Sequence, residues 1–537
     1  MLALFDEAET ITGIGGDMPL QTFAIQRLLE AVLYGFLRQV AGGDSEWTSR
    51  WRSLWDDGRH YYPALRKYLE HYRGRFNLFD AEQPFYQVAD LRTVNGKTSG
   101  LQKLILDVPN GAPFFTTRSG EGLTSLHADE AARWLVTLQA FDPSGIKSGA
   151  VGDSRVKSGK GYPIGTAWAG GIGGVSVEGE NLWRTLLLNL VGPEVSEGVD
   201  WRDDKPIWER SAVGAMPVEG FNQEKESVGV PRYFHGPATL CTWQSRRVHL
   251  IHEGSTVTGV IIANGDRLKP QNAHLFEPMT AWRRSPSQEK ALHMGSVYMP
   301  RRHDPSRALW RGIAVFLPIK NYLETASYKP PLNVQWLNLL QNDGALPENV
   351  LVRLHAFGVE YGSNESVVDA VVDDSINIRL AVLASDDPVL AARLNDAIEL
   401  AGKAVSGLCR LAGGLADLNG RAEDGARRQA NELAYNRLDH EFRSWIVDIE
   451  DLRGFDERFN EWKRRIRMIF GRLGDSIMQS ASTKALIGKT DASGVVHSAG
   501  ELDYRYRGTI NWLTSIPGAN PEKGQKAMSS QEGEEQE

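Results

Sequence analysis

Hydrophobic residues recur at helical spacing in several separate stretches of the chain. The segment PLQTFAIQRLLEAVLYGFLRQV, residues 19–40, places Phe23, Leu28 and Val32 on one stripe, and the proline at its start suits the first turn of a helix. The same spacing predicts further helices at 56–72, 127–141 and 181–191. The first part of the chain is therefore expected to hold helices joined by long loops.

Short runs of β-type residues replace this spacing between residues 203 and 380. Examples are ATLCTWQSRRVHLI, VTGVIIAN, LWRGIAVFL and VLVRLHAFGVEYG. Turn sequences such as Asn264-Gly265-Asp266 separate them. Helices and short strands in this mixture predict a large, irregular α+β domain over residues 1–380.

The pattern becomes almost wholly helical after residue 384. Ser385-Asp386-Asp387-Pro388 is a helix start, with a capping acid followed by proline in the first turn. Apolar stripes then run through 388–408, 424–447, 455–480 and 499–514. Four amphipathic helices with short connections predict a four-helix bundle over residues 381–515. The polar remainder, 516–537, is predicted to be a disordered tail.

Composition narrows the class of protein. The chain has 537 residues, 41% hydrophobic and 24% charged, as soluble globular proteins do. It has only two cysteines, Cys241 and Cys409, which excludes a disulfide framework and suits the reducing cytoplasm. No apolar run is long enough to predict a membrane span. The net charge is −8, so any surface for nucleic acid must be a local basic patch.

The stretch VKSGKGYPIG, residues 156–165, lies in a glycine-rich segment that also contains Lys147 and Arg155. It is not a P-loop. Gly159-Lys160 is followed by Gly161 instead of a hydroxyl residue, and Ser154 stands where the first glycine is needed. Ile164 breaks the dinucleotide-binding pattern in the same way. Two interpretations remain: a flexible surface loop, or a backbone that closely approaches nucleic acid.

Other chemical signatures are weak. His303-Asp304 matches the HD dipeptide of metal phosphohydrolases, but no second His/Asp set with helical spacing accompanies it. The pattern favours a solvated or phosphate-facing basic patch at Arg301-Arg302-His303 over a metal site. Three pairs of acids are expected at turns and helix caps, namely Asp203-Asp204, Asp373-Asp374 and Asp386-Asp387. A nucleotide- or metal-dependent hydrolase acting on nucleic acid stays open as an alternative function.

Basic and aromatic residues interleave between residues 240 and 311. The groups are Trp243 with Arg246 and Arg247, Arg267 with Lys269, Trp282 with Arg283 and Arg284, and Trp310 with Arg311. Arginine and lysine can contact phosphates, and aromatic rings can stack on bases. Equally, each tryptophan can anchor a core that an arginine stem covers. The repetition favours a nucleic-acid face without excluding the second interpretation.

The order of segments over residues 12–515 resembles the CasA family, the large subunits of type I-E CRISPR surveillance complexes (Cascade). The resemblance rests on PFFTTRSGEGLTSLHADEAARWLVTLQAFD, the glycine and lysine loop, NLWRTLLLNLVG, LCTWQSRRVHLI and the terminal helices. It implies a non-catalytic subunit that partners guide RNA and the backbone and small subunits. It also implies recognition of the protospacer-adjacent motif (PAM) in double-stranded DNA, help in opening the duplex, and a docking surface for a helicase-nuclease. No cofactor is implied, and the cysteine cluster of some relatives is missing, so no metal is expected.

The resemblance also assigns residues. Ser158-Gly159-Lys160-Gly161 matches the family's glycine loop, and Lys269 matches its lysine finger; both approach the PAM from the minor groove. Glycine backbone can lie close to the floor of a narrow groove, and lysine can donate to the acceptors there. The degenerate minor-groove code would explain tolerance of several PAM sequences.

Two further segments follow from the same resemblance. The turn Tyr361–Ser366 matches a wedge that splits the first base pairs; relatives carry glutamine at its tip, where this chain has Ser363, Asn364 and Glu365. The stretch PFFTTRSGEGLT, residues 113–124, matches a loop that contacts the guide's 5′ handle. In it Phe115 is expected to stack or wedge and Arg118 to meet phosphate.

Overall fold

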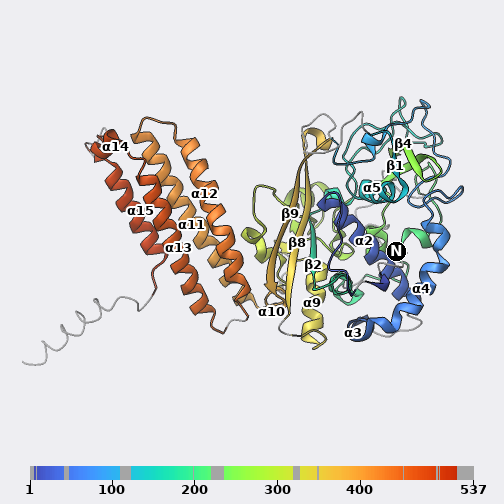
Figure 1. Ribbon diagram of the computed structural model, residues 1–537, viewed down its shortest axis with the longest axis horizontal. Helices are drawn as coiled ribbons and strands as arrows, with labels where there is room; N and C mark the ends of the chain where they lie inside the picture. The colour runs from blue at the N-terminus through green and yellow to red at the C-terminus, as the bar shows by residue number, and fades with distance from the viewer. Residues whose placement is uncertain are drawn as a thin grey trace, which may run out of the picture. The chain divides into compact units, whose positions relative to one another are not determined.

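The computed structural model describes residues 5–7, 9–40, 47–108, 123–196, 199–218, 235–318, 327–347, 350–450, 453–490, 494 and 496–516. The chain divides into two compact units, Met1–Asp386 and Asp387–Glu537 (Figure 1). The division falls a few residues after the predicted boundary at 380. The handle-loop residues Phe115 and Arg118 lie outside the described residues, as does the predicted tail from residue 517 onward.

The first unit is a mixture of helices and short sheets. Its helices are α2 (Pro19–Val40), α3 (Trp47–Asp57), α4 (Tyr62–His71), α5 (Ala128–Phe141), α6 (Leu182–Asn189), α7 (Pro237–Cys241), α8 (Pro286–Leu292), α9 (Leu332–Asn342) and α10 (Leu380–Leu383). The helix predicted at 56–72 is wrong in its extent. A 3₁₀ turn at Gly58–Tyr61 separates α3 from α4, and Pro63, which lacks an N–H, occupies the first turn of α4.

Helix α2 forms the centre of this unit. The sequence predicts one apolar stripe, but the structure buries nearly every face of the helix, including the polar residues Gln26, Arg27 and Glu30. The cause is that α2 packs against α5, α6, α7, β8 and β9 (Figure 1). Arg27 is accommodated by a bidentate ion pair with the buried carboxylate of Glu277, at 2.6 and 2.8 Å.

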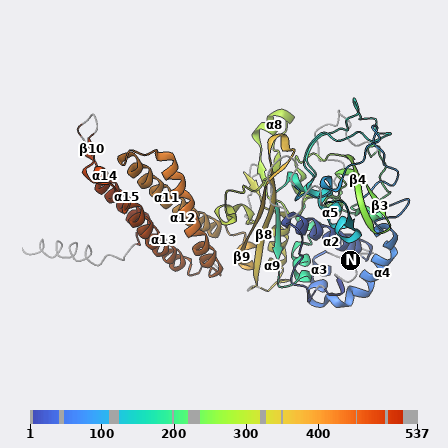
Figure 2. The same ribbon diagram turned by 45° about the horizontal axis from the view of Figure 1, so that its top comes forward.

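Three antiparallel three-stranded sheets complete the unit. The first has the order β2 (Gly174–Glu178), β8 (Leu351–Tyr361) and β9 (Val368–Arg379). The second joins β1 (Leu126–His127), β4 (Thr256–Asn264) and β3 (Arg246–Glu253), and the third β6 (Tyr298–Pro300), β5 (Trp282–Arg284) and β7 (Tyr328–Lys329). Figure 1 shows the long β8–β9 hairpin beside β2, and Figure 2 shows the same hairpin from a second side.

The predicted places of the paired acids are partly wrong. Asp373 and Asp374 lie within β9 and not in a turn. Asp204, by contrast, caps a helix that lies far from it in the sequence. Its carboxylate accepts hydrogen bonds from the backbone N–H groups of Ala238 and Thr239 at the start of α7, at 2.7 and 2.8 Å. Strands thus tolerate acids when one face is open, and a helix can be capped by a distant residue.

The second unit is the helical bundle. Its long helices are α11 (Pro388–Leu418), α12 (Glu423–Val447), α13 (Phe455–Met478) and α15 (Ala499–Leu513), which run side by side in Figure 1. A short helix α14 (Thr483–Ile487) and the strands β10 (Lys489–Thr490) and β11 (Val496–His497) lie between α13 and α15. The predicted α+β fold with a C-terminal helical bundle is confirmed.

Local signals explain where the bundle begins and what fills it. Asp387 accepts a hydrogen bond from the N–H of Val389 at 2.8 Å, so it caps α11 as expected. The indoles of Trp445 and Trp462 stack in the core with ring centroids 5.4 Å apart. Leu433 of α12 is exposed, and the next residue, Ala434, takes the core position. A small residue there lets the neighbouring helix approach closely.

Candidate nucleic-acid interface

The glycine loop is a tight β-hairpin. Lys157 and Lys160 exchange two backbone hydrogen bonds, each 3.0 Å. The two residues between them, Ser158 and Gly159, have φ of +50° and +77°, which is the pattern of a type I′ turn. Gly159 adopts this conformation without strain. Ser158, Gly159 and Lys160 are therefore the exposed tip of the hairpin, and Gly161 lies buried at its base.

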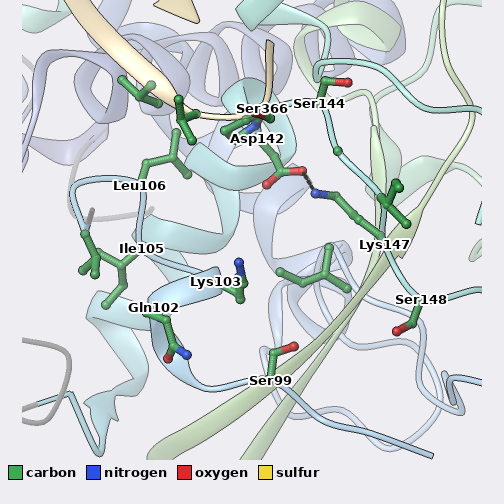
Figure 3. A pocket seen from close by; sticks show the side chains of 17 residues that line it. Ser99, Gln102, Lys103, Ile105, Leu106, Asp142, Ser144, Lys147, Ser148 and Ser366 are labelled. Atoms are coloured by element: carbon green, nitrogen blue, oxygen red, sulfur yellow. Dashed lines mark ion pairs between the residues drawn. The ribbon is translucent and has the colours of Figure 1, made fainter. Parts of the chain in front are cut away.

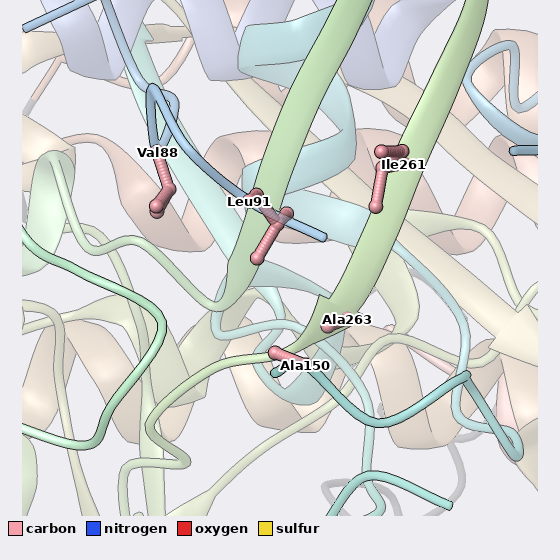
Figure 4. Close-up of a cluster of buried hydrophobic side chains, with 5 residues drawn as sticks. All are labelled: Val88, Leu91, Ala150, Ile261 and Ala263. Atoms are coloured by element: carbon pink, nitrogen blue, oxygen red, sulfur yellow. The ribbon is translucent and has the colours of Figure 1, made fainter. Parts of the chain in front are cut away.

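The base of the hairpin is fixed to the second sheet. Gly161 donates its N–H to the carbonyl of Lys147 at 3.0 Å and accepts a 3.0 Å bond from the side-chain amide of Asn264, the last residue of β4. A buried cluster supports this junction, formed by Val88, Leu91, Ala150, Ile261 and Ala263 (Figure 4). The hairpin is thus held by packing and by backbone bonds, which keeps its tip in one place.

Internal ion pairs take up several of the basic residues in this region. Asp266 pairs with Arg155 at 2.9 Å and with Arg247 at 2.5 Å. Asp142 pairs with Lys147 at 2.7 Å and also with Arg246. Arg246 and Arg247 are only 3% and 1% exposed, so they cannot face nucleic acid.

Two tryptophans of the interleaved segment are core residues as well, whereas Trp243 is half-buried. Trp282 and Trp310 are fully buried. For these residues the core-anchor interpretation is the right one, because buried rings have no face for a base. On the glycine hairpin itself, Lys157 and Lys160 are exposed.

The lysine-finger segment begins where β4 ends. Lys269 is exposed, and the neighbouring Leu268 is buried and anchors the segment. The guanidinium of Arg267 donates a 3.0 Å hydrogen bond to the carbonyl of Ile164. The Asp266 carbonyl in turn accepts one from the indole N–H of Trp243 at 2.8 Å. The segment carrying Lys269 is therefore tied to the segment that carries the glycine hairpin.

The predicted wedge is the turn between β8 and β9. Ser363 and Asn364 are exposed at its tip, and Asn364 and Glu365 have φ of +55° and +54°. The carbonyl of Glu365 accepts a 2.8 Å bond from the N–H of Ser144. Its carboxylate pairs with Arg302 at 3.0 Å, so a cation offsets the negative charge at the turn.

A cavity of about 530 Å³ adjoins both the lysine-finger segment and the wedge turn. Its lining includes Trp168, Arg246, Asp266, Arg267, Leu268, Arg283, Arg301, Arg302 and Glu365. Five arginines against two carboxylates make this lining positive within a chain of net charge −8. A positive recess of this kind attracts phosphates. We call it the arginine cavity.

The His303-Asp304 dipeptide is used structurally. The ring Nε2 of His303 lies 2.8 Å from the carbonyl of Gly174, and burial lowers the pKa of His303 to about 4. Asp304 instead accepts from the backbone N–H and hydroxyl of Ser306, at 2.9 and 2.6 Å. Across the described ranges, no group of three or more His, Cys, Asp or Glu could hold a metal ion.

Some residues beside these segments were not found from the sequence. Lys103 and Ser144 come from two distant stretches, yet they line one pocket together with Ser366, the last residue of the predicted wedge turn. Lysine and serine are common on loops, and nothing in their local sequence links them. Only the folded chain brings them together.

Comparison with known proteins assigns the family. Residues 1–473 match the sequence profile of the family described as CRISPR-associated protein Cse1. The chain belongs to the Cse1 family. A crystal structure of Thermobifida fusca Cse1 is similar to it with a TM-score of 0.85 and 37% sequence identity, covering 96% of this chain and 94% of that one.

Two other likenesses extend this result. The CRISPR-associated protein CasA/Cse1 of Thermus thermophilus is 29% identical over 323 residues, which are 59% of this chain and 56% of that relative. The match therefore spans little more than half of the relative's length. A chain of a CRISPR RNA-guided surveillance complex has the same fold, with a TM-score of 0.65 at 17% identity over 95% of this chain and 94% of that one.

Within the described residues, no helix is long and apolar enough to cross a membrane.

Proposed function

We propose that this chain is the non-catalytic large subunit of an RNA-guided CRISPR surveillance complex that reads the PAM of double-stranded DNA through the minor groove. Membership of the Cse1 family supports the first part. In such a complex, guide pairing reads the target sequence, and protein reads the PAM and the backbone. The partners are guide RNA, the backbone and small subunits, target DNA, and a helicase-nuclease that docks on the subunit.

One observation carries the proposal. Asp142 and the end of β4 connect all three segments that the family resemblance assigns to DNA. Asn264 and Asp266 hold the glycine hairpin and the lysine-finger segment together. Ser144, two residues after Asp142, holds the wedge turn through Glu365. Segments far apart in sequence thus share one rigid support, as readout of a duplex requires.

Each segment has a distinct task in this proposal. The backbone at Ser158-Gly159 lies against the floor of the minor groove, where side chains would not fit. Lys269 donates to base acceptors there, while Lys160 meets phosphate. Ser363 and Asn364 enter the duplex below the PAM and favour opening and R-loop formation. Glu365 is tolerated beside DNA because Arg302 offsets its charge.

The hydrolase alternative gains no support from the geometry. The two side chains of His303-Asp304 have separate hydrogen-bond partners and do not converge. Gly159-Lys160 forms one side of a hairpin turn, whereas a P-loop leads from a strand into a helix. Recognition of DNA is the function that these segments fit best.

The test compares guide-loaded complexes assembled with and without this chain. Two duplexes carry the same target, one with the PAM and one with the PAM scrambled, and affinity is measured by gel shift at a fixed salt concentration. Tight binding is expected to need both the chain and the PAM. Equal binding of both duplexes, or no effect of the chain, would refute the proposal.

A residue-level version uses two lysines. Lys269→Ala is expected to weaken binding of the PAM duplex about tenfold, the scale of one base contact worth about 1 to 3 kcal/mol. The matched control is Lys67→Ala, which removes an exposed lysine of α4 and is expected to leave PAM discrimination unchanged. A uniform loss on both duplexes would mean that Lys269 contacts phosphate and not the groove floor.

A further inference from the structure

A second pocket lies beside the proposed DNA-facing segments, with a volume of about 360 Å³. Four parts of the chain line it (Figure 3): 99–108, 142–148, Ile262 of β4, and 366–368 at the start of β9. In the stretch 142–148, the carbonyl of Lys147 accepts the N–H of Gly161 at the base of the glycine hairpin. Ser366 is the last residue of the wedge turn. The pocket therefore opens between two of the three segments assigned to DNA. We call it the serine–lysine pocket.

The charges of this pocket suit an anion. Lys147 reaches the carboxylate of Asp142 at 2.7 Å, and Asp142 is already paired with Arg246. Lys103 lines the same pocket, and Figure 3 shows its ammonium group pointing into the space near Lys147. Burial is the main cause that lowers the pKa of Lys147, and the positive charges of Arg246 and Lys103 lower it further. Lys147 and Arg246 share the carboxylate of Asp142, and Lys103 adds a further cation to the lining. Lysine ammonium groups on the wall of a pocket can contact a phosphate.

The rest of the lining suits a nucleoside. Ser99, Ser144, Ser148 and Ser366 offer hydroxyls, and Gln102 offers an amide, which can donate and accept as base edges and sugar hydroxyls do. Ile105, Leu106, Val108, Ile262 and Val367 form an apolar wall on which a flat base can lie. Polar groups outweigh apolar ones on the exposed lining, as suits a ligand that has a phosphate, a sugar and base edges.

The size of the pocket restricts the ligand. Pockets for small ligands span about 300 to 1,000 Å³, and this one lies near the lower end at about 360 Å³. A base pair of a stacked duplex cannot enter such a space. A single nucleotide that has been unpaired and turned out of the stack can.

We propose that the serine–lysine pocket binds one unpaired nucleotide of the displaced DNA strand, with its phosphate against Lys103 and Lys147 and its base against the apolar wall. This rests on the function proposed above. When the wedge turn separates the first base pairs, the target strand pairs with guide RNA. The displaced strand is then the one left without a partner, and the pocket begins at Ser366, at the end of that turn. Holding one of its nucleotides would oppose reclosing of the duplex.

Photo-crosslinking tests the location directly. Guide-loaded complexes that contain the full chain receive a PAM-bearing duplex with 4-thiothymidine in the displaced strand next to the PAM. Parallel arms carry the label in the target strand or carry 4-thiouridine in the guide. After irradiation, crosslinked peptides are identified by mass spectrometry. The expected product joins the displaced strand to peptides from 99–108 or 142–148. A guide or target-strand crosslink there, or none at all, would overturn the proposal.

A variant adds the energetic test. Lys103→Ala removes one cation and is expected to reduce the displaced-strand crosslink about tenfold, the scale of one charge-assisted hydrogen bond. Lys67→Ala on α4 is the control and should not change it. Binding of a PAM-bearing duplex that does not match the guide, and so cannot open, should survive Lys103→Ala. A crosslink unchanged by Lys103→Ala would overturn the pocket assignment. If the unsubstituted complex shows no PAM-dependent binding, the proposed function of PAM recognition is refuted instead.

Discussion

Replacing Gly159 with alanine tests whether the hairpin tip lies against DNA. Gly159 has φ of +77°, and a methyl group added there would meet only Val94, at 3.9 Å. The cost to the fold is therefore conformational and not steric. Alanine in this left-handed region costs about 1 to 2 kcal/mol. With an unfolding entropy of about 2 cal/mol/K per residue, the melting temperature of the unit Met1–Asp386 should fall by only about 1 to 3 °C.

The matched control is Gly254→Ala. Gly254 lies in the turn between β3 and β4, has φ of +57°, and has nothing within 4 Å of an added methyl group. It should therefore destabilise the same unit to a similar degree. Since the family resemblance assigns no DNA contact to that turn, its effect on DNA binding is expected to be small.

The two variants should differ in binding. A methyl group at Gly159 would hold the backbone away from the groove floor and remove about one hydrogen bond. That loss is worth about 1 to 1.5 kcal/mol, or roughly five- to tenfold in affinity. Gel shifts of guide-loaded complexes with PAM and scrambled duplexes measure it, and thermal melts measure stability. An equal loss in both variants, or full affinity in Gly159→Ala, would refute the reasoning.

Three stability predictions concern other parts of the first unit. Burial raises the pKa of Glu30 well above its usual range, so the folded state loses stability as pH rises from the usual pKa of this carboxyl to its raised one. Glu30→Gln should remove that cost and raise the melting temperature at pH 7. Burial alone would lower the pKa of His355. Hydrogen bonds and charge from Glu178, and then from Asp373, outweigh this effect and raise the pKa of His355. This stabilisation should be present below about pH 6.5 and disappear as pH rises through the raised pKa, and a melt series should lose that dependence in His355→Gln. Asp204→Ala removes the buried cap of α7 and should cost about 1 to 2 kcal/mol in chemical denaturation; an unchanged midpoint would contradict the capping role.

The sequence predicted the fold class because the signals that define it are local. Helical spacing, the Asp387-Pro388 start and the turn residues each act within a few positions, so the bundle and most helices could be placed. The full burial of α2 could not, because it depends on partners from remote strands and helices. The break between α3 and α4 has a local cause, Pro63, which the apolar spacing across it conceals.

The sequence could indicate the exposed residues of the candidate site, but not the buried residues that hold them in place. Gly159 and Lys160 stand out because glycine and lysine together are unusual in a core. In the sequence, Lys147 and Arg155 lie in the same glycine-rich segment as these two residues. In the structure, this lysine and arginine pair with Asp142 and Asp266. Asp266 lies more than a hundred residues from Arg155, and such pairing arises only when the chain is folded.

The cap at the start of α11 has a consequence for how the chain can be divided. Because Asp387 supplies the hydrogen bond that begins the bundle, a polypeptide starting just before it would carry its own initiation signal. The two units meet in sequence at Asp386 and Asp387. The two units could thus be expressed as separate polypeptides that come together only on their assembly partners. The subunit would then form when both polypeptides are present and would not form when either is missing.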